Sequence, residues 1–174
     1  DFIEDSKARG QTFFLQISHY AVHSNIEYSA ESLALFADRE KGVVHSNSGY
    51  AAMLYDLDES ISELLRAYEE LELNEDTYLI FVSDNGGMPS IPMQLNLGRP
   101  YPQILNSPLL RGKWDLTEGG LRVPFMIVGP DVAPGSQSDI PVVTYDLLPT
   151  LAELAGSEIE LPEDLDGGSF RGLL

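Results

Sequence analysis

Hydrophobic and polar positions along the chain alternate between short apolar runs and one long stretch of helical spacing. The runs at residues 13–18, 79–83 and 125–128 are flanked by polar or turn-forming residues, which is typical of short buried strands. Apolar residues recur at helical spacing from position 50 to position 71, which predicts a long amphipathic helix. A second helix is predicted over residues 145–155, where Gly156 suits the carboxyl-terminal end.

This order of elements predicts an α/β protein with a mostly parallel sheet flanked by helices. The strands at residues 13–18 and 79–83 are expected to be parallel, with the helix at 50–71 as a right-handed crossover between them. A length of 174 residues predicts a single domain over residues 1–174. Ligands bind beyond the carboxyl ends of parallel strands, so the loops that follow the strands are the places to look for chemistry.

Charge excludes several classes of partner. The chain has 28 acidic and 10 basic residues, a net charge of −18. Such a field repels phosphate backbones and anionic lipids, so neither a nucleic acid nor a membrane surface is an expected partner. The chain has no cysteine, which excludes a disulfide framework and a cysteine nucleophile and suits an oxidising compartment.

One stretch of the chain has the opposite charge balance. Between residues 105 and 125, Arg111, Lys113 and Arg122 outnumber Asp115 and Glu118. This positive stretch either reflects chance composition or marks the place where an anionic ligand group binds.

Three groups of residues could carry chemistry. Asp84 and Asn85 follow the second predicted strand and offer oxygen donors of the kind that Ca²⁺ or Mg²⁺ prefers, although the same residue types also form simple turns. His19 and His23 follow the first predicted strand and could exchange a proton near neutral pH, or serve only structure. Lys113 follows a glycine and could approach an anion closely, or be a solvated loop charge.

Taken in order, these segments resemble the carboxyl-terminal half of the catalytic domain of the sulfatase family, within the alkaline-phosphatase-like superfamily. The matching segments are FFLQISHYAVH at 13–23, YAAMLYDLD at 50–58, LIFVSDNGG at 79–87, LRGK at 110–113 with EGGLRVP at 118–124, DLLPTL at 146–151 and DGGS at 166–169.

The resemblance implies a partial alkaline-phosphatase-like fold and the hydrolysis of sulfate esters. It implies that Asp84 and Asn85 are metal ligands. The metal is usually Ca²⁺, with Mg²⁺ as the alternative. It also implies that Lys113 contacts the sulfate group and that His23 lies near the ester oxygen, so that both are catalytic and substrate-binding residues. The expected substrate is a small sulfate ester or a sulfated glycan, and the expected location is periplasmic or secreted.

The chain also departs from the family pattern. The family nucleophile is a formylglycine made from Cys or Ser in a Cys/Ser-x-Pro-x-Arg motif, and the nearest approach here, SIPMQ at residues 90–94, lacks the arginine. The resemblance therefore implies a fragment that lacks the amino-terminal half of the catalytic domain and is inactive alone. Two alternatives stay open: a phosphate or phosphonate ester hydrolase of the same superfamily, and a non-catalytic module that keeps the fold.

Overall fold

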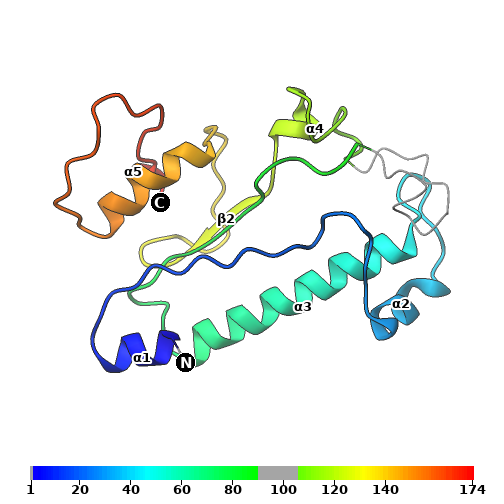
Figure 1. Cartoon of the computed structure of the whole chain (residues 1–174), viewed down its shortest axis with the longest axis horizontal. Coiled ribbons are helices and arrows are strands. Elements are labelled where there is room, and N and C mark those ends of the chain that lie inside the picture. The colour runs from blue at the N-terminus through cyan, green and yellow to red at the C-terminus, as the bar shows by residue number, and fades with distance from the viewer. Residues whose placement is uncertain (1, 90–105) are drawn as a thin grey trace. The chain divides into compact units, whose positions relative to one another are not determined.

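The computed structural model describes residues 2–89 and 106–174. The chain divides into two compact units, each described by itself: the first contains Asp1–Leu73 and Asn85–Val123, and the second contains Asn74–Asp84 and Pro124–Leu174. The elements are labelled in Figure 1. The SIPMQ segment at residues 90–94 lies outside the described residues.

The main element of the first unit is the long helix α3 (Ser48–Glu70), which confirms the helix predicted over residues 50–71. It begins at Asn47, whose side chain accepts a hydrogen bond of 2.9 Å from the backbone N–H of Tyr50, the usual way to satisfy a free donor in the first turn. Met53, on the buried face of α3, packs with Ile26 to form the core of this unit.

Two short helices in the first unit were not expected from the sequence. Helix α2 (Ala30–Ala37) packs against α3, and Figure 1 shows it beside the amino-terminal end of that helix. Helix α1 (Phe2–Ala8) lies near the carboxyl-terminal end of α3. There the Lys7 ammonium donates a hydrogen bond to the carbonyl of Leu71, the residue that follows α3. Helices of about two turns carry too few apolar repeats to be recognised by periodicity.

The strand predicted at residues 13–18 is wrong. This segment has no regular secondary structure, and its side chains after Phe13 are exposed, with Phe14 71% exposed. A strand needs a neighbour that completes its ladder of hydrogen bonds, and no segment of residues 2–89 or 106–174 pairs with this one. The predicted parallel pairing with residues 79–83, and the crossover through α3, are therefore not found.

The sheet of the second unit is antiparallel. Strand β1 (Leu79–Val82) pairs with β2 (Phe125–Val128), with Leu79 opposite Val128. Both strands were predicted, but the antiparallel direction of their pairing was not. The Ser83 N–H extends the pairing with a hydrogen bond of 3.3 Å to the carbonyl of Pro124.

Helix α5 (Leu147–Leu154) confirms the second predicted helix and follows the 3₁₀ turn η2 (Thr144–Asp146). A further 3₁₀ turn, η3 (Arg171–Leu173), comes near the end of the chain. The Phe170 ring meets the Phe125 ring of β2 edge to face, with 5.5 Å between centroids. This contact joins the carboxyl-terminal segment to the sheet.

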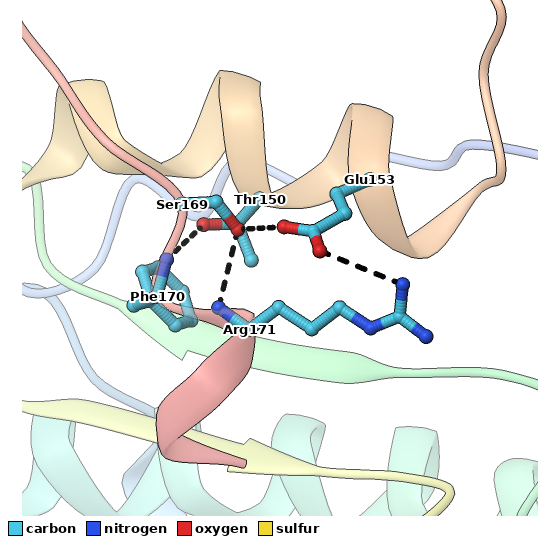
Figure 2. A network of polar contacts seen from close by, with 5 residues as sticks. All are labelled: Thr150, Glu153, Ser169, Phe170 and Arg171. Atoms are coloured by element: carbon cyan, nitrogen blue, oxygen red, sulfur yellow. Dashed lines mark hydrogen bonds and ion pairs between the residues drawn. The ribbon is translucent and has the colours of Figure 1, made fainter.

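Thr150 connects α5 to the carboxyl-terminal segment from inside the second unit. Its side chain is fully buried, with 0% exposure. The Thr150 hydroxyl donates to the carbonyl of Asp146 at 2.7 Å and accepts from the N–H of Phe170 at 3.0 Å. Figure 2 shows the contact of Thr150 with Phe170 and, beside it, the contacts that Ser169 and Arg171 make with Glu153.

Asp146 makes a second connection between the same two segments. One carboxylate oxygen accepts from the N–H of Val143 at 2.8 Å, and the other accepts from the N–H of Gly168 at 2.9 Å. The DLLPTL and DGGS segments, recognised separately in the sequence, are therefore two parts of one structural joint. In the described parts of the chain, no helix has the length and apolar character needed to cross a membrane.

Candidate functional site

His23 and Lys113, 90 positions apart in the sequence, meet in the first unit. The Lys113 Nζ lies 3.3 Å from the His23 Nε2. The other ring nitrogen, Nδ1, lies 2.9 Å from the carbonyl of Ser24. Because a carbonyl can only accept, Nδ1 is the donor in this contact, and Nε2 faces the ammonium. The His23 ring and the Lys113 ammonium therefore form one polar pair on the surface of the first unit.

The core around α3 positions His23. Ala21 and Val22, just before it, pack against the Ile26–Met53 core. The His23 N–H then donates to the carbonyl of Tyr20 at 2.8 Å, which turns the chain back at this point. The imidazole itself is exposed, so the core fixes the loop and leaves the ring accessible.

Asn106 positions the segment that carries Lys113. Its amide nitrogen donates to the carbonyls of Gly87 at 2.8 Å and Arg111 at 2.9 Å. The Gly87 carbonyl also accepts from the Lys113 N–H at 2.8 Å. The loop after β1 and the Lys113 loop are thus joined side by side. The sequence reading overlooked Asn106, because an asparagine in a loop is also a common turn residue.

Glycines let three loop backbones come unusually close. A Cβ on Gly86 would lie 1.9 Å from the carbonyl oxygen of Gly119, and a Cβ on Gly112 would lie 2.2 Å from that of Gly87. The short helix α4 (Glu118–Leu121) closes this cluster, where the Gly120 carbonyl accepts from Gly86 at 3.0 Å. The glycines near Lys113 therefore serve close backbone packing.

The positive stretch at residues 105–125 resolves into two ion pairs and one remaining cation. Arg111 pairs with Asp115 at 2.8 Å, and Arg122 pairs with Glu118 at 3.5 Å. Lys113 has no carboxylate partner in the part of the chain that the structure describes. The excess positive charge is therefore concentrated at Lys113, beside a ring that can take up or release a proton.

Asp84 and Asn85 lie where β1 ends. Asp84 is exposed, whereas Asn85 is half-buried and opens the loop that Gly86 and Gly87 join to the Lys113 segment. Asp84 belongs to the second unit and Asn85 to the first. The expected convergence of Asp84 with His23 and Lys113 stays a prediction.

The chemistry of these two residues fits Ca²⁺ or Mg²⁺, but their number does not. Ca²⁺ binds roughly six to eight oxygen ligands, and Mg²⁺ binds about six. Across residues 2–89 and 106–174, no group of three or more His, Asp or Glu side chains is arranged to hold a metal ion. This chain therefore offers a partial set of donors, and no reaction step follows from it.

The other two histidines lie outside this arrangement. His19 is exposed in the segment that forms no strand. His45 Nε2 lies 3.2 Å from the carbonyl of Ser107, next to Asn106. The sequence suggested no role for His45, and the contact gives it a structural one.

Residues 1–157 match the sequence profile of the family described as Sulfatase, and the chain belongs to that family. Among curated proteins, it is 32% identical to a sulfatase of Formosa agariphila, over 99% of this chain and 32% of that protein. It is 34% identical to human arylsulfatase A, over 100% of this chain and 31% of the relative. The chain spans about a third of the length of these relatives.

A solved structure shows the same architecture. Ps i-CgsB, crystallised with k-i-k-neocarrahexaose, superposes with a TM-score of 0.77 at 31% sequence identity. The match covers 96% of this chain and 34% of the other. Together with the family match, this similarity confirms the expected partial sulfatase fold of the alkaline-phosphatase-like class.

Proposed function

We propose that this chain is the carboxyl-terminal part of the catalytic domain of a sulfuric ester hydrolase, and that the sulfate group binds at Lys113 and His23. The observation that carries the proposal is the 3.3 Å approach of the Lys113 ammonium to the His23 ring. Support also comes from the ion pairs of the neighbouring arginines, which leave Lys113 as the cation available to an anion.

Each residue has a distinct role in this proposal. The Lys113 ammonium compensates the charge on the sulfate oxygens as the ester bond breaks. The protonated His23 ring donates its Nε2 proton to the oxygen of the leaving alcohol, and solvent water, which reaches the exposed ring, restores the proton. Asp84 and Asn85 contribute oxygen donors to a divalent cation, Ca²⁺ in preference to Mg²⁺, whose remaining ligands come from elsewhere in a longer protein. When bound, the cation polarises the sulfate oxygens.

The proposed substrate is a sulfated glycan. Support comes from Ps i-CgsB, solved with a neocarrahexaose, and from an ulvan-active sulfatase of Formosa agariphila, which is 33% identical over 84% of this chain. A periplasmic or secreted location suits such a substrate and suits a chain without cysteine.

The test uses the longest gene product that contains this chain. Hydrolysis of 4-nitrophenyl sulfate and 4-nitrophenyl phosphate is compared for the parent protein and for Lys113→Ala and His23→Ala. We expect sulfate to be preferred and each variant to lower kcat/KM about 100-fold, the usual cost of losing one charge-stabilising or proton-transferring group.

Arg122→Ala is the control, because Arg122 is exposed and already paired with Glu118; its activity should not change. Preference for the phosphate ester would replace this proposal with a phosphoester hydrolase. Absence of both activities in the longest protein would favour a non-catalytic module.

A further inference from the structure

Trp114 stands in a backbone conformation that disfavours a large side chain. Its φ angle is +76°. The Asp115 N–H donates to the Gly112 carbonyl at 3.0 Å, so Trp114 is the third residue of a four-residue turn. With positive φ, that position is typically glycine, and a bulky residue there is an outlier. Such conformations cluster at ligand sites.

Burial of the Trp114 side chain does not offset the energetic cost of this backbone conformation. Trp114 is 78% exposed and lies outside the Ile26–Met53 core. The ring lies beside the cation of the proposed sulfate site, with its centroid 5.9 Å from the Lys113 Nζ, within the range of a cation–π contact. An exposed aromatic face is therefore held next to the place where the anion would bind.

We infer that Trp114 is a stacking platform for the alcohol part of the substrate, and so determines which sulfate esters bind. This inference rests on the proposed binding of sulfate at Lys113. An indole face packs well on a flat apolar surface, either an aryl ring or the C–H face of a sugar. Because the ring centroid lies 5.9 Å from the Lys113 Nζ, an ester whose sulfate group contacts Lys113 would have its alcohol part within reach of Trp114. The preferred ligands are thus sulfate esters with a flat alcohol part, rather than small aliphatic ones.

The chain provides its own probe, because Trp114 is its single tryptophan. The 174-residue chain is titrated with inorganic sulfate, methyl sulfate, galactose 6-sulfate and phenyl sulfate. Affinity is measured by calorimetry, and contact with the ring is measured by tryptophan fluorescence. We expect the galactose and phenyl esters to bind about three- to tenfold more tightly than methyl sulfate. We also expect these two esters to change the fluorescence more than methyl sulfate does.

Substitutions of Trp114 then show whether the preference for flat esters depends on a flat aromatic ring or only on a hydrophobic side chain. Trp114→Phe should keep the preference for flat esters, and Trp114→Leu should abolish it while the affinity for inorganic sulfate stays the same. Leu116→Ala is the matched control, because Leu116 is 89% exposed in the same loop but aliphatic; it should change no affinity. Trp114→Gly should lose the preference without lowering the melting temperature, because glycine suits this turn position.

The outcomes distinguish the two proposals. If the parent chain does not bind inorganic sulfate, or Lys113→Ala binds it equally well, the proposed sulfate site is wrong and this inference falls with it. If sulfate binds through Lys113 but Trp114→Leu keeps the preference for flat esters, only the stacking role is wrong.

Discussion

Asn106 illustrates how one uncharged side chain can determine where a charged one lies. Its amide nitrogen contacts the carbonyls of Gly87 and Arg111, and the Lys113 N–H shares the Gly87 carbonyl. These hydrogen bonds hold together the two loops next to the Lys113 side chain, which faces His23. Asn106 is a positioning residue for the proposed sulfate site.

Replacing Asn106 by Asp should weaken sulfate binding. The new carboxylate would face the two carbonyl oxygens that now accept hydrogen bonds, so we expect a loss of about 1–3 kcal/mol in the free energy of unfolding. Sulfate affinity of the folded protein should also fall, because the Lys113 loop loses its support. Calorimetric titration and urea unfolding measure both quantities. Asn74→Asp is the control, since Asn74 is exposed and its amide donates to its neighbour Glu75. Unchanged sulfate affinity in Asn106→Asp would contradict the positioning role.

Asp56 predicts a pH dependence of stability. The Ser32 hydroxyl and the Ser29 N–H, at 2.5 and 2.8 Å, hold the pKa of the Asp56 carboxyl below its ordinary value of 3.8. A depressed pKa stabilises the folded chain above the pKa of the unfolded state, and this stability is lost as the pH falls through the folded pKa.

The melting temperature of Asp56→Asn should therefore lie below that of the parent chain at pH 6. The gap should shrink as the pH falls below about 4. Asp58→Asn, at an exposed site on the same helix, is the comparison. A gap for Asp56→Asn that stays constant from pH 6 to pH 3 would contradict the proposed linkage.

At the scale of elements, hydrogen bonds between segments decide the arrangement as much as helices and strands do. The first unit joins three loops through Asn106 and the glycines, and α2 is joined to α3 through Asp56. The second unit joins α5 to the carboxyl-terminal segment through Thr150. In both units the joints are polar and partly buried, so removing one partner leaves the other unsatisfied.

Thr150 provides the sharpest test at this scale. Thr150→Val keeps the shape but removes the acceptor for the buried N–H of Phe170, so we expect a loss of about 1–3 kcal/mol in the free energy of unfolding. Thr150→Ser keeps the hydroxyl and should cost about 1 kcal/mol for the lost methyl group. Glu153→Gln, which alters the exposed contacts of Glu153 with Arg171 and Ser169, should cost about 0.5 kcal/mol. Urea unfolding followed by circular dichroism measures all three, and a Val variant as stable as the Ser variant would rule out this role.

At the scale of the whole molecule, the chain carries part of a larger proposed site. The chain spans about a third of the length of its curated relatives, and Asp84 and Asn85 are the metal donors that the sequence predicts. Two side chains with water should bind Ca²⁺ with a Kd of about 1 mM or weaker. Calorimetric titration of the 174-residue chain tests this, with Asp84→Asn as the matched variant. Micromolar affinity would show that the chain has a complete site of its own.

The sequence by itself determined the long helix α3, the helix α5, the positions of β1 and β2, and the family. Each of these depends on local periodicity or on residue order, which are present in one stretch of chain. The sequence also selected His23 and Lys113, because their residue types and neighbouring motifs suggested chemistry.

Tertiary structure alone decided how these pieces meet. Strand direction depends on which segment supplies the facing hydrogen bonds, so β1 pairs antiparallel with β2 and residues 13–18 form no strand. The contact of His23 with Lys113 joins residues 90 positions apart, and Asn106 ties the Lys113 loop to the loop after β1. Periodicity contains no information about such pairings, because they arise only when distant segments are brought into hydrogen-bonding distance.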